Sequence, residues 1–173
     1  MTVIRLATRP AEVDAAFRVR HDVFVVEQGV PADLERDAQD SDADHLVAYD
    51  AERPVGAGRL VVEPAGFEGV DPALGPVGHL GRLAVRPEAR GARLGAGLVA
   101  AIEQRAQQRG LAVMTLAAQT YAIPFYERLG YTAHGAEFDD AGLPHRWMTR
   151  TLSGSALQPG SRVVDPHREA PGA

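Results

Sequence analysis

The stretch LAVRPEARGARLGAGL, residues 83–98, joins a short apolar run to a loop that contains three arginines and three glycines. Apolar residues from Leu94 to Ile102 recur at helical spacing, which predicts a helix over residues 92–109. A glycine-rich turn that enters a helix is a natural anion site, because unpaired backbone N–H groups and the positive end of the helix dipole meet there. The stretch therefore predicts a strand, a phosphate-binding loop and a helix.

Two common phosphate loops do not fit this stretch. A Walker A loop needs a lysine after its glycines, and the chain contains arginine but no lysine. The dinucleotide fingerprint G-x-G-x-x-A is spelled by Gly95, Gly97 and Ala100, but the preceding strand ends at Val85, well before the first glycine. The strand expected at residues 111–118 also lacks an acidic residue that could hold a ribose. Walker-type ATP hydrolysis is excluded, and dinucleotide binding is disfavoured.

The composition excludes several other classes of function. The 173 residues have no cysteine, and the single serine in residues 1–152 is Ser41, so cysteine and serine nucleophiles are not expected. A net charge of -5 argues against nucleic acid as a partner. No apolar run approaches the roughly 20 residues of a membrane span, and the first residues do not read as a signal peptide, so we expect no membrane partner and a cytoplasmic protein.

The order of predicted elements indicates an α/β domain with a mixed sheet and helices on its faces. A first strand is followed by a helix over 10–26, an acidic segment over 31–44, and strands over 45–50, 54–63 and 77–85. After these come the helix over 92–109, a strand over 111–118, a short helix over 122–129, and strands over 131–138 and 144–152. Alternation in the third of these strands places Val77, His79, Gly81, Leu83 and Val85 on one face. We expect one domain over residues 1–152 and a disordered tail over residues 153–173.

The acidic segment, residues 31–44, has two interpretations, of which a solvated face is preferred to a cation-attracting rim of a substrate cleft. Its run DSDAD does not read as an EF-hand, because His45 and Ala51 stand where the loop needs glycine and glutamate. No metal site is therefore expected. In the preceding helix, Arg20 falls on the apolar stripe, where we expect it to pair with an acid rather than to snorkel outward or face a site.

Four segments, in order, resemble the GNAT superfamily of acetyl-CoA-dependent N-acetyltransferases. Residues 83–98 resemble its motif A, with Arg90 at the first motif place, Gly95 at the last, and Arg93 where glycine is usual. The run AAQTYAIPFYERLGY, residues 117–131, resembles the signature A-x-x-F-Y-x-x-x-G-F/Y. The runs RHDVFVVEQGVP, residues 20–31, and DAGLPHRWM, residues 140–148, are similar to the ElaA branch, in which a basic residue at the fourth motif place also occurs. The resemblance covers residues 3–152.

The resemblance implies a mostly antiparallel mixed sheet with helices on both faces and a splayed pair of central strands. In such a fold, the exposed backbone of Leu83, Ala84 and Val85 pairs with the pantetheine of acetyl-CoA, and the Val85 N–H stabilises the oxyanion. The pyrophosphate would be bound by the loop residues Arg90, Gly91, Ala92, Arg93, Leu94, Gly95 and Ala96. The acetyl group would pass directly to a primary amine of a small molecule or a protein, and a homodimer is one arrangement that the superfamily offers.

The resemblance also implies the catalytic groups. Tyr126 matches the tyrosine that protonates the departing thiolate, and its ordinary pKa of about 10 keeps it protonated at neutral pH. His79 lies where some members carry the base that deprotonates the amine, and a pKa near 6.5 suits that role. Glu27 and His145 are rival candidates for the base or for an amine-binding group.

The remaining site residues and functions are open at this point. Gln28 and Arg20 are candidates for shaping the substrate pocket. A non-catalytic acyl-CoA-binding module is one alternative function, although Tyr126 argues against it. An acylhomoserine lactone synthase, which shares the fold, is disfavoured by the intact coenzyme A loop. The sequence does not identify the amine.

Overall fold

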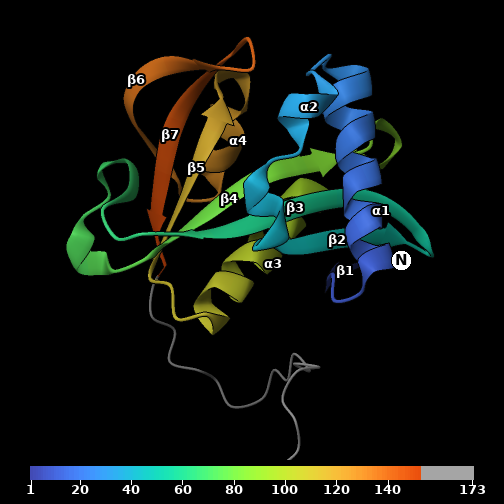
Figure 1. Ribbon diagram of the computed structural model, residues 1–173, viewed down its shortest axis with the longest axis horizontal. Coiled ribbons are helices and arrows are strands. Elements are labelled where there is room, and N and C mark those ends of the chain that lie inside the picture. Colours follow the sequence, from blue (N-terminus) through green and yellow to red (C-terminus); the bar gives the residue numbers. More distant parts are fainter. Residues whose placement is uncertain (153–173) are drawn as a thin grey trace, which may run out of the picture.

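The computed structural model describes residues 1–152, which form one seven-stranded sheet (Figure 1). The strands are β1 Thr2–Leu6, β2 Asp44–Asp50, β3 Arg53–Glu63, β4 Val77–Val85, β5 Val113–Gln119, β6 Thr132–Asp140 and β7 Leu143–Thr151. Their order across the sheet is β1-β2-β3-β4-β5-β7-β6, and every neighbouring pair except β4–β5 is antiparallel. The mixed and mostly antiparallel sheet is the predicted one. The expected tail, residues 153–173, lies outside the described residues.

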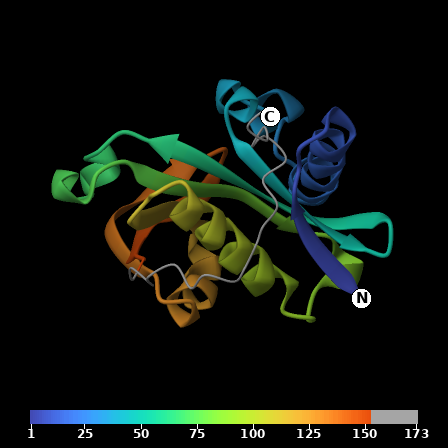
Figure 2. The ribbon, with the colours of Figure 1, turned by 90° about the horizontal axis from the view of Figure 1, so that it is seen from below.

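Helices cover both faces of the sheet, as Figure 2 shows in the edge view. On one face, α1 Pro10–Arg20 continues without a break into a π-helical turn, η1 His21–Glu27, and packs Ala16 and Val19 against β2 and β3. On the other face lie α3 Leu94–Gln108 and the short α4 Ile123–Arg128, which follows the 3-10 turn η6 Thr120–Ala122. Leu98 and Ile102 of α3 are completely buried in the main core. The helix expected over 10–26 is thus present, with a last stretch wound more widely than an α-helix.

The acidic segment folds into two short turns, α2 Ala32–Glu35 and η2 Ala38–Ser41, on the same side as α1. Two further 3-10 turns, η3 Phe67–Gly69 and η4 Pro72–Leu74, lie in the loop between β3 and β4, and η5 Pro87–Ala89 follows β4. These connections place polar residues next to the middle of the sheet, where β4 and β5 meet.

A β-bulge in β4 corrects the strand alternation expected from the sequence. Ala57 of β3 lies opposite Ala84 and Arg59 lies opposite Gly81, so β4 has one residue more than β3 between these pairs. The extra residue is accommodated by Arg82, whose φ of 52° is in the left-handed region. His79 packs toward the side that carries α1, whereas Leu83 and Val85 pack against the α3 core. The five alternate residues of β4 therefore do not share one face, because the bulge reverses the alternation.

The only parallel pair in the described sheet separates soon after it begins. The β4–β5 ladder consists of two pairs, Gly78 with Met114 and His79 with Thr115. Beyond them the two strands diverge, as Figure 1 shows. A bulge increases local twist and bends its strand, so the left-handed Arg82 accounts for the direction in which β4 leaves β5. The divergence leaves backbone groups on the facing edges of both strands available to a ligand.

Candidate active site

A cavity of about 460 Å³ fills the gap between the diverging strands. Every face of it comes from a different part of the chain: η1, the acidic segment, β4, β5, α4 and the β6–β7 hairpin. The side chains that matter for chemistry in its wall are Gln28, Glu35, Asp37, Arg59, His79, Arg82, Gln119, Tyr126, His145 and Trp147. The topology thus brings together Gln28, His79, Tyr126 and His145, four of the residues expected from the sequence.

A second cavity of about 270 Å³ adjoins the first and borders the arginine-rich loop. Gln28, Leu83 and Tyr121 line both cavities, so the two meet at these side chains. The second cavity also contacts Ala84 and Val85. Arg86 donates to the Val55 carbonyl of β3 at 2.9 Å, and bonding alternates along an antiparallel strand. The N–H of Val85 therefore points away from β3, into the gap.

The loop between β4 and α3 presents its backbone amides outward. Gly91 and Arg93 both have positive φ, 86° and 58°, and Arg93 is the residue that precedes the first turn of α3. Within the described residues, no N–H of residues 91–96 donates to a backbone or side-chain acceptor in the protein. Six amides without a protein acceptor, at the positive end of a 15-residue helix, fit a pyrophosphate. Arginine replaces the usual glycine at position 93 without changing the left-handed turn that the loop requires.

The two glycines that imitate a dinucleotide fingerprint have packing roles. A Cβ on Gly95 would lie 3.4 Å from the ring of Phe125, and a Cβ on Gly97 would lie 3.3 Å from the Cδ1 of Ile4. Both glycines thus let α3 approach its neighbours closely. The amide of Gly95 is still one of those available for an anion at the helix N-terminus.

Glu27 lies on the loop side of the site. Its carboxylate accepts two hydrogen bonds from Nη2 of Arg90, at 2.7 and 2.9 Å, and Glu27 and Arg90 both line the second cavity. The Nε of Arg90 also donates to the Val85 carbonyl at 3.0 Å. Glu27 is absent from the wall of the larger cavity, where His79 and His145 lie. The geometry therefore assigns Glu27 to holding Arg90 and separates it from the other two candidates for the base.

His79 is held by a carboxylate that sequence reasoning missed. Its Nδ1 lies 3.0 Å from Oε1 of Glu63, the last residue of β3. Burial lowers the pKa of His79, and the hydrogen bond to Glu63 opposes that change only in part. The imidazole is therefore neutral near pH 7 and able to accept a proton. Nothing in the sequence singles out Glu63, because its closeness to His79 depends on the β3–β4 register.

His145 and Gln28 also point into the larger cavity. The Nδ1 of His145 contacts the Leu143 carbonyl at 2.8 Å, so Nδ1 carries the proton, because a carbonyl can only accept. Gln28 accepts a hydrogen bond from the side chain of Gln119 at 3.1 Å, which joins η1 to the end of β5 where the two cavities meet. Gln119 is a second site residue that the sequence did not reveal.

Tyr126 is almost completely buried on α4, with its ring against Phe125 and Tyr131. Burial raises the pKa of Tyr126 far above its ordinary value, so the hydroxyl stays protonated at any physiological pH. It lines the larger cavity, and it has no hydrogen-bond partner among residues 1–152. An unpaired hydroxyl that is accessible from an adjoining open space is suited to donate to a ligand atom there.

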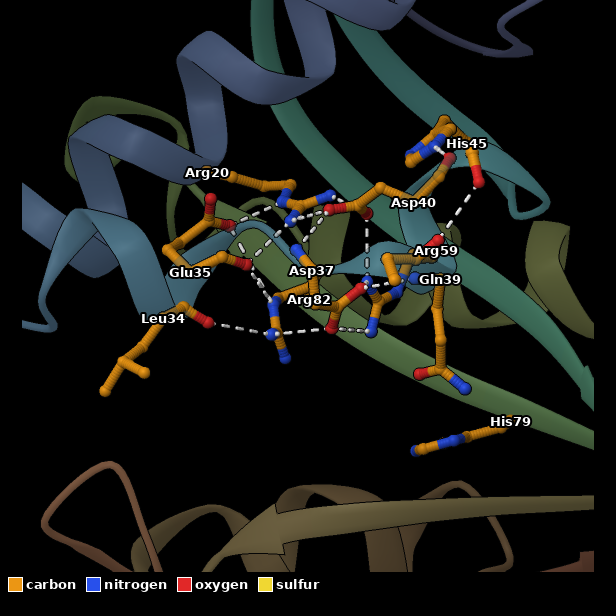
Figure 3. A network of polar contacts seen from close by, with 12 residues as sticks. Arg20, Leu34, Glu35, Asp37, Gln39, Asp40, His45, Arg59, His79 and Arg82 are labelled. Carbon is orange, nitrogen blue, oxygen red and sulfur yellow. Dashed lines mark hydrogen bonds and ion pairs between the residues drawn. The ribbon is translucent and has the colours of Figure 1, made fainter.

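Arg20 does not line the cavity, although it was a candidate for shaping it. Its guanidinium is fully buried, with Nε 2.5 Å from Glu35 and Nη1 2.7 Å from Asp40 (Figure 3). Burial alone would raise the pKa of Asp40, but the hydrogen bond from Arg20 holds it well below its usual range. The expected pairing with an acid is present, and Arg20 belongs to the wall of neither cavity.

The acidic segment is only in part the solvated face that was preferred: most of residues 31–44 are exposed, but Glu35, Asp37 and Asp40 pair with arginines. Arg59 binds Asp37 and Asp40 at 2.7 and 2.9 Å, and Arg82 binds Asp37 at 3.2 Å. Figure 3 shows these acids interleaved with the arginines of α1, β3 and β4. The segment is therefore anchored by three arginines, and part of it forms the cavity wall, where Glu35 and Asp37 are already paired with arginines.

The described part of the chain gives no indication of a metal or a membrane. Among residues 1–152, no group of three or more His, Asp or Glu side chains could hold a metal ion. In the same residues, none of the helices combines the length and the apolar character that a bilayer crossing requires.

Comparisons with known proteins agree with this architecture. Residues 8–152 match the acetyltransferase (GNAT) domain family. The chain is 38% identical over 146 residues to the uncharacterised N-acetyltransferase YjcF of Bacillus subtilis (strain 168), an alignment that covers 84% of this chain and 96% of YjcF. An acyl-CoA N-acyltransferase structure from Pseudomonas aeruginosa superposes with a TM-score of 0.72 at 28% identity, covering 87% of this chain and 99% of that one.

Escherichia coli ElaA has the same fold, with a TM-score of 0.69 over 87% of this chain and 99% of ElaA, at 23% identity. The match of the domain family over most of the chain, together with the splayed strands and the amide-lined loop, shows what kind of protein this is. The chain belongs to the GNAT acetyltransferase family and is an acyltransferase.

Proposed function

We propose that the protein transfers an acetyl group from acetyl-CoA directly to a primary amine of a small molecule or a protein. The observation that carries this proposal is that the two cavities at the β4–β5 gap share part of their walls. One cavity reaches the edge of β4 and Arg90, where the loop of unpaired amides begins, and the other borders a neutral histidine and a buried tyrosine. A ligand that spans both would have its phosphates at the loop and its reactive end between His79 and Tyr126.

The residues of the loop and of β4 fit coenzyme A. The amides of residues 91–96 and the charge of Arg93 would bind the pyrophosphate, and the exposed edge of Leu83, Ala84 and Val85 would pair with pantetheine. Bound acetyl-CoA supplies an activated thioester. The N–H of Val85, which points into the gap, is the donor that would stabilise negative charge on the carbonyl oxygen.

His79 prepares the amine. An amine acceptor is largely an ammonium ion at neutral pH and becomes nucleophilic only after it loses a proton. The neutral imidazole of His79 would accept that proton at Nε2, directly or through one water. His145 presents the same nitrogen to the cavity, but its partner is a carbonyl, which stabilises an imidazolium less than the carboxylate beside His79 does.

Tyr126 assists departure of the thiol. Its hydroxyl would donate a hydrogen bond to the sulfur as negative charge develops there, and would supply the proton as an acid. Because burial raises the pKa of Tyr126 above that of a thiol, donation of a strong hydrogen bond contributes more than early transfer of the proton.

A turnover assay tests the proposal. The full chain is incubated with acetyl-CoA and a panel of polyamines, amino sugars, aminoglycosides and peptides, and both thiol release and acetylated product are measured. We expect release that depends on an amine and product in equal amount. Binding of acetyl-CoA without amine-dependent release from any member of the panel would favour the non-catalytic acyl-CoA-binding module instead.

A further inference from the structure

We propose that Glu63 is the positioning residue for His79: it keeps the imidazole proton on Nδ1 and thereby presents Nε2 to the cavity as the proton acceptor. This inference rests on the proposed function, in which His79 is the base. Glu63 is not in the cavity wall and touches no reacting atom, so it acts only through the ring of His79.

The register of β3 and β4 places the two residues together. Val61 lies opposite His79, and Glu63 lies opposite Val77, so Glu63 and His79 are diagonal neighbours on one face of the pair. The Oε1 of Glu63 lies 3.0 Å from Nδ1 of His79, and the two side chains are only 11% and 17% exposed. An ionised carboxylate accepts hydrogen bonds and cannot donate them, so Nδ1 must carry the proton.

A second side chain also holds the carboxylate of Glu63 in place. The side-chain amide of Gln39, in η2, donates to the same Oε1 at 2.9 Å. The acidic segment that carries Gln39 is itself anchored, because Asp37 and Asp40 on either side of Gln39 bind Arg59. Figure 3 shows Gln39 and His79 at the edge of this network. The network therefore restricts where the carboxylate can lie, and through it the imidazole.

The imidazole ring is also fixed by aromatic neighbours. Its centroid lies 5.4 Å from that of Phe67 and 5.6 Å from that of Trp147, and the rings of Phe67 and Trp147 meet edge to face. With these rings beside it and Nδ1 bound to Glu63, rotation of the ring would break a hydrogen bond between two largely buried side chains. Nε2 has no hydrogen-bond partner among the described residues, and His79 lines the cavity.

The pair suits the proton transfer that the reaction needs. Nε2 takes a proton from the acceptor ammonium, the imidazole becomes an imidazolium, and the amine keeps the electron pair with which it attacks. The new positive charge forms beside Glu63, which stabilises it, whereas Arg59 and Arg82 act against it. After product leaves, the imidazolium returns the proton to water. Glu63 thus offsets the burial and the arginines that disfavour a charged His79.

The first test determines, without any substrate, which ring nitrogen of neutral His79 carries the proton. Long-range proton–nitrogen correlation spectra of the histidine rings are recorded above the pKa of His79, and its signals are assigned by their loss in His79→Gln. We expect the Nδ1–H form in the native protein and a shift toward the Nε2–H form in Glu63→Leu, which has no side-chain acceptor. Glu103→Leu removes a similarly buried carboxylate, bonded to Arg150 and Tyr131 away from the cavity, and should leave the His79 signals unchanged. A native His79 protonated at Nε2 would overturn the proposal.

The second test reads the pH dependence of kcat/KM. Glu63 raises the pKa of His79, so Glu63→Leu should move the acidic limb to lower pH and reduce the plateau roughly 10- to 100-fold, with Glu103→Leu unaffected. A limb that stays in place at an unchanged plateau would contradict a positioning role. Failure of the proposed function gives a different result: His79→Gln would keep full activity, whatever tautomer the spectra show.

Discussion

The side chain of Arg90 joins three parts of the site: its Nη2 donates to both carboxylate oxygens of Glu27, at 2.7 and 2.9 Å, and its Nε donates to the Val85 carbonyl at 3.0 Å. Glu27 ends the π-helical turn, Val85 ends β4, and Arg90 begins the amide-lined loop. The guanidinium therefore sets the position of the loop relative to the strand edge. It also commits the carboxylate of Glu27 to a structural pair on the cofactor side.

Replacement of Arg90 should weaken binding of acetyl-CoA. We expect Arg90→Ala to raise KM for acetyl-CoA about tenfold, because the loop loses the charge-assisted hydrogen bonds that hold it to Glu27 and to the Val85 carbonyl. The value of kcat should change much less. Glu27→Gln serves as the matched variant: it should leave the acidic limb of kcat/KM in place. Loss of that limb in Glu27→Gln would instead identify Glu27 as the base.

Substitutions at Arg93 can separate the contribution of its left-handed backbone from that of its side-chain charge. Arg93→Gly should preserve or slightly raise the thermal midpoint, because glycine adopts a φ of 58° without strain. The same variant should raise KM for acetyl-CoA by a few fold, since an exposed cation beside the pyrophosphate is removed. Arg93→Lys should restore most of the affinity. A lower midpoint for Arg93→Gly would show that the turn depends on the arginine side chain.

Tyr126→Phe tests the donor to the sulfur. The substitution removes one hydroxyl from a well-packed aromatic cluster, so the free energy of unfolding should change little. Because the hydroxyl acts as charge develops on the thiol, we expect kcat to fall roughly 10- to 100-fold with KM for acetyl-CoA nearly unchanged. Rates are measured by thiol release under saturating amine. A full rate in Tyr126→Phe would remove Tyr126 from the mechanism.

The buried ion network should make stability depend on Arg20 and on acid pH. Arg20→Met leaves Glu35 without its close buried partner and leaves Asp40 with Arg59 alone, and it should lower the free energy of unfolding by about 3–5 kcal/mol in urea titrations.

Asp40 has a lowered pKa in the folded state, so its contribution is present above its unfolded pKa of about 3.9 and is lost as pH falls toward the folded value. Asp40→Asn should therefore flatten the acid side of the stability curve. An unchanged slope would show that Asp40 is not the titrating group.

Much of the fold could be predicted because the periodicities were strong. Strand β4 at 77–85 and helix α3, which follows the arginine-rich loop, both lie where expected. They could be predicted from the spacing of apolar residues and from the glycines that end helices and strands. The alternation within β4 could not be predicted, because the bulge at Arg82 depends on pairing with β3. A single inserted residue reverses the faces of all residues beyond it.

The candidate site divides in the same way. The loop and Tyr126 belong to local motifs, so the sequence pointed to them directly. Glu63 and Gln119 act through contacts between strands or turns that are distant in the chain, and no local pattern marks them. Arg20 and the acidic segment each showed unusual charge, but only their contact in three dimensions shows that the charges cancel.

The central claim is that the loop amides and the free edge of β4 bind coenzyme A. Amide proton–nitrogen spectra of the full chain, recorded during titration with coenzyme A, test it most directly. The account predicts the largest shifts at residues 83–85 and 91–96, with smaller shifts in Arg90→Ala at the same ligand concentration. Shifts that spare both segments, or that centre on the opposite edge of the sheet at β1, would contradict it.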